Sequence, residues 1–281
     1  MRCLVNLLAG ANIEPFLYYP KQKIKKINYY LCPTNTTKML LAIDIGNTKI
    51  KAAVFEQTAL TEKFVFTPKE AAQGIKNIFI KYPKLTQSIV STVGKEENEL
   101  LLWLKAHSQL TAVSHSTAFP FINGYATPAT LGIDRMVLAA GAVMQYPHSH
   151  RLVIDAGTCI TYDFIDAQDN YLGGAISPGL QLRYAAMHNF TAKLPLLYPE
   201  TPQNYIGNTT KESMHSGVVN GVLHEVEGFI KQYDKEYQPL TVILTGGSAN
   251  FLAKRLKNTI FANSNFLLES LNLLHQYTNQ K

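Results

Sequence analysis

A short sequence pattern occurs twice in the chain and restricts the folds that the chain can adopt. Leu41-Ala-Ile-Asp-Ile-Gly and Leu152-Val-Ile-Asp-Ala-Gly align without gaps, and each is followed by a threonine and a second apolar run. A strand that ends at an aspartate, turns through glycine and returns as a strand is a β-hairpin. The same order found twice is typical of a duplicated, domain-sized unit. We therefore predict an α/β protein with two duplicated domains, residues 39–147 and 148–281, which meet near Pro147–His150.

Apolar periodicity predicts helices and further strands in the order that such a unit requires. Helical spacing predicts helices over residues 71–81, 96–107 and 134–146, and an apolar run predicts a strand over 88–93. In the second half we expect strands over 152–154 and 160–165. A third strand, over 242–245, runs into Gly246-Gly247 ahead of a helix over 249–256.

Each hairpin turn carries the groups that bind a phosphate chain. The glycine of the turn lets backbone N–H groups approach an anion closely, and Thr48 and Thr158 add a hydroxyl donor to each turn. The Asp44 carboxylate can hold a hydrated Mg²⁺ ion on phosphate oxygens, and Asp155 begins the second turn in the same way. The Gly246-Gly247 pair lets a flat base or a ribose approach the backbone. Two facing turns would thus grip a polyphosphate between two domains.

Composition excludes several functional classes. The chain has 281 residues, of which 46% are hydrophobic, so it can bury a full core. Nearly all of the net charge of +6 lies in residues 1–38, and no nucleic-acid-binding surface is expected in the rest. Cys3, Cys32 and Cys159 are widely spaced, which argues against disulfides or a zinc site and fits a cytoplasmic protein. No apolar stretch is as long as a membrane span, and the P-loop and Rossmann glycine motifs are absent.

Residues 1–38 do not fit the repeated pattern. Because Met39 directly precedes the first strand, we expect Met39 to be the real start and the upstream residues to be a mis-assigned leader. Two alternatives stay open. The run Cys3–Ala11 behind Arg2 can be read as a short signal peptide, although Asn6 interrupts it. The stretch can also be a genuine N-terminal extension of unknown role.

The order of hairpin, repeated hairpin and strand–Gly–Gly resembles the actin/hexokinase/Hsp70 superfamily. In that superfamily two RNase H-like (actin-like ATPase) domains enclose a nucleotide cleft. Further segments make the chain similar to the type III pantothenate kinases, over residues 39 to at least 256. These segments are Gly132-Ile-Asp134-Arg135 with Tyr125 and Pro128 before it, Asp155-Ala-Gly-Thr158-Cys-Ile-Thr161, Gly173-Gly-Ala-Ile-Ser-Pro-Gly179, and Thr210-Lys-Glu-Ser-Met-His-Ser-Gly217. The resemblance implies phosphorylation of pantothenate to 4′-phosphopantothenate, the first committed step to coenzyme A.

The resemblance also implies a role for each matched residue. The ATP phosphates would be bound by Asp44, Ile45, Gly46, Asn47, Thr48, Lys49, Ile50, Lys51 and Thr158, with Mg²⁺ near Asp44. Asp134 would be the general base. The pantothenate site would be lined by Tyr125, Gly132, Ile133, Asp134, Arg135 and Thr210. Asp155 would hold a monovalent cation, K⁺ or NH₄⁺. The family is dimeric, so a homodimer is expected, with the substrate pocket at the border of the subunit interface.

Alternatives to this interpretation remain open on the sequence. A carboxylate beside an acceptor hydroxyl orients it and accepts its proton, but acidic residues are also common in the first turn of ordinary helices. Asp134 would then be a helix-start carboxylate and Arg135 a surface cation. Two other functions are possible: another small-molecule kinase of the superfamily, or a non-catalytic nucleotide-binding regulator of the kind proposed for the Bvg accessory factor. The presence of Asp44, Asp134 and Asp155 favours an enzyme, because a binding module needs no base.

Overall fold

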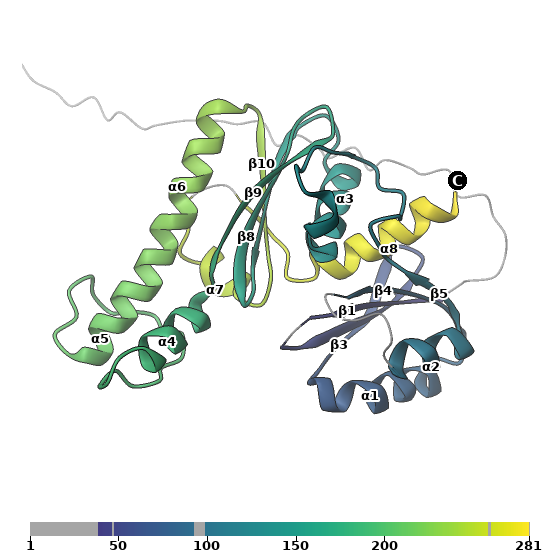
Figure 1. Cartoon of the computed structure of the whole chain (residues 1–281), viewed down its shortest axis with the longest axis horizontal. Coiled ribbons are helices and arrows are strands. Elements are labelled where there is room, and N and C mark those ends of the chain that lie inside the picture. Colours follow the sequence, from purple (N-terminus) through teal and green to yellow (C-terminus); the bar gives the residue numbers. More distant parts are fainter. Residues whose placement is uncertain (1–38, 47, 93–98, 258–259, 281) are drawn as a thin grey trace, which may run out of the picture. The chain divides into compact units, whose positions relative to one another are not determined.

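The first half of the described chain forms a five-stranded sheet. The computed structural model describes residues 39–46, 48–92, 99–257 and 260–280, so the predicted leader and Asn47 lie outside the described residues. The strands β1 (Met39–Ile45), β2 (Ile50–Glu56) and β3 (Ala59–Phe66) are antiparallel neighbours, and β4 (Leu85–Thr92) and β5 (Gln109–Ala112) follow β1 in parallel. The strand order is β3-β2-β1-β4-β5. The helices α1 (Pro68–Lys81) and α2 (Glu99–His107) lie on one face of this sheet (Figure 1).

The second half repeats the same order. The strands β7 (His150–Ala156), β8 (Cys159–Ile165) and β9 (Asn170–Pro178) are antiparallel, and β10 (Leu240–Thr245) and β11 (Phe261–Ala262) follow β7 in parallel. The order β9-β8-β7-β10-β11 therefore matches the first sheet strand for strand. A short strand, β6 (Ile122–Asn123), pairs with the outer edge of β9. The predicted duplicated α/β fold is confirmed, whereas the division of the chain at residue 147 stays a prediction.

Local sequence explains where the first elements begin and end. α1 begins at Pro68, three residues before the predicted start. The carboxylate of Glu70 accepts hydrogen bonds from the backbone N–H and the hydroxyl of Thr67, so the helix start is capped. Proline is tolerated there because the first turn of a helix has no partner for its N–H. β1 is buried from Met39 to Asp44, as expected for a central strand with both faces covered.

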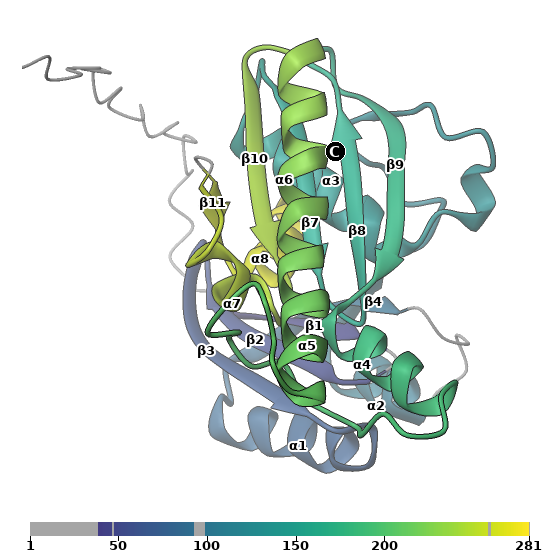
Figure 2. The same ribbon diagram turned by 90° about the vertical axis from the view of Figure 1, so that its left-hand side faces the viewer.

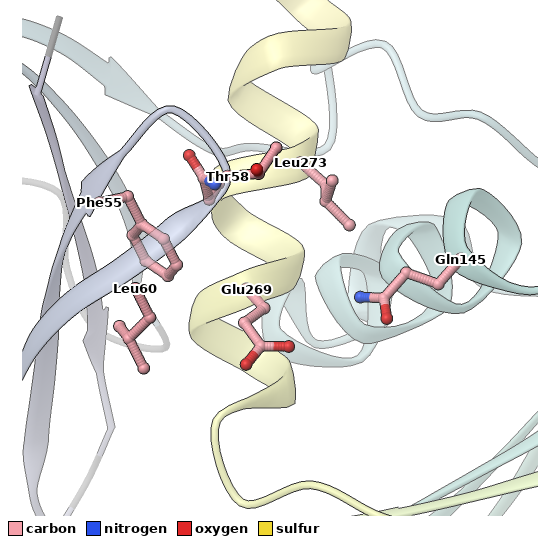
Figure 3. A pocket seen from close by; sticks show the side chains of 7 residues that line it. Phe55, Thr58, Leu60, Gln145, Glu269 and Leu273 are labelled. Atoms are coloured by element: carbon pink, nitrogen blue, oxygen red, sulfur yellow. The ribbon is translucent and has the colours of Figure 1, made fainter. Parts of the chain in front are cut away.

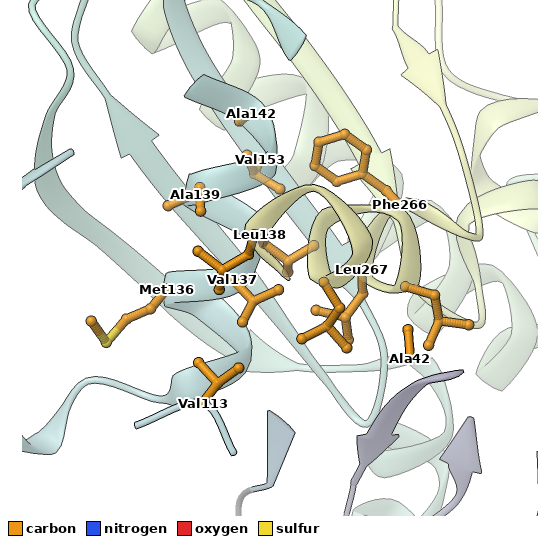
Figure 4. Close-up of a cluster of buried hydrophobic side chains, with 14 of the residues drawn as sticks. Ala42, Val113, Met136, Val137, Leu138, Ala139, Ala142, Val153, Phe266 and Leu267 are labelled. Atoms are coloured by element: carbon orange, nitrogen blue, oxygen red, sulfur yellow. The ribbon is translucent and has the colours of Figure 1, made fainter. Parts of the chain in front are cut away.

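The helices α3 (Ile133–Gln145) and α8 (Phe266–Asn279) form a core to which both sheets contribute. Ala42 of β1 and Val153 of β7 belong to the same cluster of buried side chains as these helices (Figure 4). Ile133, the first residue of α3, packs against this cluster. At Gly141 the two helices are so close that an added Cβ would lie 1.8 Å from the hydroxyl oxygen of Ser270. This packing fixes the start of α3, where several predicted site residues lie.

A long helical segment covers the other face of the second sheet (Figures 1 and 2). α5 (Thr210–His215) continues through a π-helical turn, Ser216–Asn220, into α6 (Gly221–Glu236). Val222 and Val226 of α6 pack against Leu152 and Tyr162, which point away from α3. The other described helices are α4 (Leu180–Asn189), α7 (Ala249–Ala253) and a 3-10 turn at Pro128–Thr130. Among the described residues, no helix combines the length and apolar character needed to cross a bilayer.

Candidate active site

The first predicted phosphate turn begins at Asp44, which is nearly buried at the end of β1. Its carboxylate accepts a hydrogen bond from the hydroxyl of Ser91 (3.1 Å) and lies opposite Lys51 in the β1–β2 ladder. Burial raises the pKa of Asp44 to about 6, and Lys51 and Ser91 oppose the shift only in part. Ile45 and Ile50, at the ends of the two strands, pack in the core of the first half and so anchor the turn.

The first and second phosphate turns meet. The N–H of Gly46 donates to the carbonyl of Lys49 (3.2 Å) and closes the first turn. Thr48 and Lys49 are exposed beyond the strand ends. The hydroxyl of Thr48 lies 3.3 Å from the hydroxyl of Thr158 in the second turn. Two threonine donors, one from each repeat, are thereby brought to one place, as the repeated sequence predicts.

Asp155 carries an orphaned carboxylate oxygen. Its Oδ1 is buried and has no hydrogen-bond partner among the described residues. Burial raises the pKa of Asp155 to about 7; Lys51 opposes the shift, and the charges of Asp134 and Asp44 add to it. A buried oxygen that lacks a donor is an environment that a cation would satisfy. The chemistry of this position therefore fits a cation.

The strand–Gly–Gly segment packs directly against the second turn. Gly246 has a φ of +93°, and a Cβ there would lie 2.2 Å from Asp155 Oδ1. The N–H of Ser248 donates to the carbonyl of Ala156 (2.9 Å). Gly246 is thus required for close packing on Asp155, whereas an added Cβ at Gly247 would meet no atom within 4 Å. Of the pair, Gly247 is the position with open space beside it.

Asp134 joins this group from the start of α3. A Cβ at Gly132 would lie 2.4 Å from Asp134 Oδ1, so the glycine leaves room for the carboxylate. The same oxygen accepts a hydrogen bond from the backbone N–H of Arg135 (2.9 Å). After burial, the negative charge of Asp134 is a further cause of the raised pKa of both Asp44 and Asp155. Three carboxylates from three elements therefore converge, and Lys51 is the cation that acts on two of them.

Arg135 is held by a buried carboxylate. Its Nε and Nη2 lie 2.8 and 2.7 Å from Asp163 Oδ1. Asp163 also accepts hydrogen bonds from the hydroxyls of Tyr171 (2.6 Å) and Thr161 (3.0 Å). The guanidinium carbon lies 5.8 Å from the centre of the Tyr125 ring. Burial alone would lower the pKa of Arg135, but the Asp163 carboxylate raises it, so the side chain stays charged.

Arg135 is only 6% exposed, so the alternative interpretation as a surface cation is wrong. Sequence reasoning also missed its partner, Asp163. The sequence does contain a signal for this partner, because alternate residues of a strand share a face and Thr161 and Asp163 are therefore on the same side of their strand. In the structure, Thr161 lies opposite Asp155. Asp163 therefore points to the same face as Asp155, where a buried charge requires a partner. Tyr171 could not be found in this way, since it lies on β9, whose limits the sequence did not reveal.

Thr210 lies apart from the other predicted substrate residues. It is the first residue of α5 and lines a cavity of about 670 Å³ together with Arg183, Met187, Leu194 and Met214. Within the described part of the chain, no hydrogen bond or ring contact joins Thr210 to Tyr125 or Arg135. Thr210 thus lies on α5 beside this cavity, whereas Arg135 lies in the first turn of α3 and does not line it.

A second cavity, of about 350 Å³, contains no predicted site residue (Figure 3). Phe55, Leu60 and Leu273 form its apolar wall, and Glu269 and Gln145 supply polar groups. Gln145 is the last residue of α3, whereas Asp134 lies in the first turn of that helix. The cavity is thus at the opposite end of α3 from the converging carboxylates.

Comparison with known proteins identifies the family. The family model described as type III pantothenate kinase matches residues 40–232 of this chain. The chain belongs to the type III pantothenate kinase family. As a member of this family it is an enzyme, a kinase, and the predicted resemblance is confirmed.

Curated members of the type III pantothenate kinase family are similar over nearly their whole length. A type III pantothenate kinase of Flavobacterium johnsoniae is 56% identical over 239 residues, which cover 85% of this chain and 98% of the relative. Those of Christiangramia forsetii (85% and 98% covered) and Bacteroides fragilis (86% and 99%) are 48% and 38% identical. A solved structure from Campylobacter jejuni, placed in the Baf family of transcriptional activators, shares the fold. Its TM-score is 0.56 at 21% identity, and the match covers 86% of this chain and all of that one.

Proposed function

We propose that this protein transfers the γ-phosphoryl group of ATP to the hydroxyl of pantothenate and so forms 4′-phosphopantothenate for coenzyme A biosynthesis. The observation that carries the proposal is the convergence of Asp44, Asp134 and Asp155 from the two repeats and α3. Relatives 56% and 48% identical, named type III pantothenate kinases, support the choice of substrate. Phosphoryl transfer depends on positioned groups and charge neutralisation more than on covalent catalysis, and these residues supply both.

The two phosphate turns are the proposed ATP site. Backbone N–H groups around Gly46 and the paired hydroxyls of Thr48 and Thr158 would donate to phosphate oxygens. Lys51, which acts electrostatically on both Asp44 and Asp155, would neutralise phosphate charge. A Mg²⁺ ion that arrives with ATP would be held near Asp44, where it would offset the negative charge of the transferred group.

Asp155 is the proposed site of K⁺ or NH₄⁺. The support is its buried Oδ1, which lacks a donor, together with a pKa that burial raises to about 7. A bound cation would return this carboxylate to its ionised form. Gly246 packs on the same oxygen, since a Cβ there would lie 2.2 Å from Asp155 Oδ1, so this position must stay glycine.

Asp134 is the proposed general base. Its Oδ1 is held by the backbone N–H of Arg135, which orients the carboxylate at the start of α3. Asp134 would accept the proton of the pantothenate hydroxyl as that oxygen bonds to the γ-phosphorus. Arg135, Tyr125, Gly132 and Ile133 would line the pantothenate site around it.

We further propose that the protein is a homodimer and that Thr210 completes the pantothenate site from across the subunit interface. The support is that α5, which begins at Thr210, lies apart from α3, which carries Arg135 (Figure 1). Large apolar side chains are also exposed between α4 and α5: Phe190 is 87% exposed and Ile206 is 86% exposed, with Tyr198 and Tyr205 nearby in the sequence. Such exposed apolar surface marks an interaction site.

A non-catalytic regulator is not favoured, because the curated relatives are kinases. We place the reaction in the cytoplasm, in line with the widely spaced cysteines and the need for ATP. The test is ADP release from ATP and Mg²⁺, with and without pantothenate, in K⁺ or Na⁺ buffer. The proposal predicts release that depends on pantothenate and is faster in K⁺. Nucleotide binding without pantothenate-dependent release would contradict it.

A further inference from the structure

A buried polar cluster lies on the face of the second sheet that α3 covers. It consists of Asp163 and Thr161 of β8, Tyr171 of β9 and Arg135 of α3. Asp163 and Tyr171 are 0% exposed. We propose that Asp163 and Tyr171 are positioning residues for pantothenate binding, which they serve by fixing the guanidinium of Arg135. The inference rests on the proposed function, in which Arg135 contacts pantothenate.

The geometry of the cluster restricts Arg135 to one orientation. Three donors reach a single oxygen, Asp163 Oδ1: Arg135 Nε (2.8 Å), Arg135 Nη2 (2.7 Å) and the Tyr171 hydroxyl (2.6 Å). The other oxygen accepts from Thr161 (3.0 Å), so the carboxylate itself cannot rotate freely. A guanidinium is planar, and two of its nitrogens on one carboxylate oxygen set the direction of the third. Arg135 Nη1 is the nitrogen that Asp163 does not contact, and Tyr125 also hydrogen-bonds to the Arg135 side chain.

Tyr171 also contacts Tyr125, another predicted substrate residue, and helps to position its ring. Its ring centre lies 6.1 Å from that of Tyr125, and the Tyr125 ring in turn lies beside the Arg135 guanidinium. Gly173, two residues further along β9, has a φ of +104°, and a Cβ there would lie 3.3 Å from the Tyr125 ring. Tyr125 and Arg135 thus rest on the same buried pair, Asp163 and Tyr171.

A role in positioning agrees with the energetics of buried charges. An ion pair taken out of water adds little net stability, because desolvation offsets much of the attraction. A side chain that must be ordered before it binds a ligand weakens binding, since its rotamer entropy is lost in the complex. Arg135 is ordered by Asp163 beforehand, so this cost is met during folding. The loss of Asp163 should therefore be felt in pantothenate binding more than in ATP binding.

The test is steady-state kinetics of the full chain for both substrates, with Asp163→Asn, Tyr171→Phe and the control Tyr162→Phe. Asparagine keeps an acceptor but removes the charge, so kcat/KM for pantothenate should fall about 10- to 100-fold. Tyr171→Phe should lower it about 3- to 10-fold. Tyr162 is the matched control: it is equally buried, lies on the opposite face of β8 and donates to Glu225 (2.8 Å). Its substitution should leave kcat/KM for pantothenate within about twofold.

A double-mutant cycle shows whether Asp163 acts through Arg135. In an Arg135→Gln background, Asp163→Asn should change kcat/KM for pantothenate by less than about twofold. The KM for ATP should stay within about twofold in all variants that fold. Equal losses of kcat/KM for ATP and for pantothenate, or additive effects of the two substitutions in the cycle, would overturn the inference. If Asp163→Asn does not fold, the same comparison of the two substrates is made with Tyr171→Phe. If the wild-type protein itself shows no pantothenate-dependent turnover, it is the proposed function that fails.

Discussion

At the scale of single residues, the site is a balance between three carboxylates and the cations that they face. Asp44 and Asp155 each end a central strand, and Asp134 lies in the first turn of α3. Without a bound cation, burial keeps the pKa of Asp44 and Asp155 well above that of a free aspartate. The ionised carboxylates are therefore unfavourable while no cation is bound. They become favourable when a phosphate chain arrives with its own cations.

Asp134→Asn should separate turnover from nucleotide binding. The amide keeps the shape and can still accept the Arg135 N–H, but it cannot take a proton from the pantothenate hydroxyl. A general base contributes about 10²–10⁴-fold in rate, so kcat should fall by that factor while the KM for ATP changes little. A helix-start carboxylate alone would cost roughly 0.3–1 kcal/mol in stability and leave turnover intact. The measurement is kcat at saturating ATP, with a thermal melt as the control for folding.

Asp155→Asn should stabilise the protein at high pH when K⁺ is absent. Burial raises the pKa of Asp155 to about 7, with Lys51 in opposition, from a usual value near 3.8. The folded state then binds more protons than the unfolded state between these values, so its stability falls as the pH rises through them. The variant lacks this loss, which is on the order of 4 kcal/mol for a pKa raised from 3.8 to about 7. Its Tm in a K⁺-free buffer should exceed that of the wild type by several degrees at pH 8, and by little at pH 4.

The control for this experiment is Asp166→Asn, for which the expected change in Tm at pH 8 has the opposite sign. Burial of Asp166 is outweighed by hydrogen bonds from Asn170 and Gln168, which lower its pKa, so its charge stabilises the fold above that pKa. That variant should melt below the wild type at pH 8. Added K⁺ should raise the Tm of the wild type more than that of Asp155→Asn. An Asp155→Asn protein that melts with the wild type at every pH, and responds equally to K⁺, would remove Asp155 from the cation site.

The sequence predicts those site residues that stand in a recognisable turn and misses those that depend on contacts between elements. Asp44 and Asp155 follow from a strand that ends at an acid before a glycine, which is a local pattern. Asp163 lies in the middle of a strand, and its role depends on α3, which carries the Arg135 side chain to it. Tyr171 becomes relevant only through the pairing of β8 with β9.

At the scale of elements, α3 links the site to the core. It carries Asp134 in its first turn and small residues in its middle, which allow α8 to pack closely against it. The sequence predicts α3 to within one residue at each end, because its apolar periodicity is strong. It does not predict β3, in which polar side chains such as Glu62 and Lys63 interrupt the apolar pattern of a strand. Strands of that kind are specified by their neighbours rather than by their own composition.

Gly141→Ala should destabilise the protein although alanine favours helix. The new Cβ would lie 1.8 Å from Ser270 Oγ and 2.6 Å from Ser270 Cβ, so α3 and α8 would have to separate. Overpacking of this kind costs about 1–3 kcal/mol, which urea unfolding would measure. Gly228→Ala on α6 is the control, because an added Cβ there meets nothing within 4 Å and should stabilise by up to about 1 kcal/mol. Adding Ser270→Gly should restore much of the loss, and failure of that rescue would contradict the packing argument.

At the scale of the whole molecule, duplication is the organising feature and was visible in the sequence. The same strand order occurs twice, and the two turns that follow β1 and β7 meet through Thr48 and Thr158. What a single sequence cannot reveal is the position of Thr210, which the fold carries to a cavity away from Arg135. In the proposed homodimer, Thr210 would reach pantothenate from a second copy of the chain, and no local pattern encodes that arrangement.

Identification of the reaction product shows whether this protein phosphorylates pantothenate. The full chain would be incubated with ATP, Mg²⁺, K⁺ and pantothenate, and the products followed by mass spectrometry and ³¹P NMR. We expect 4′-phosphopantothenate in amounts equal to the ADP formed, and little of either with Asp134→Asn. ADP without phosphorylated pantothenate, or bound ATP that is never turned over, would contradict this expectation.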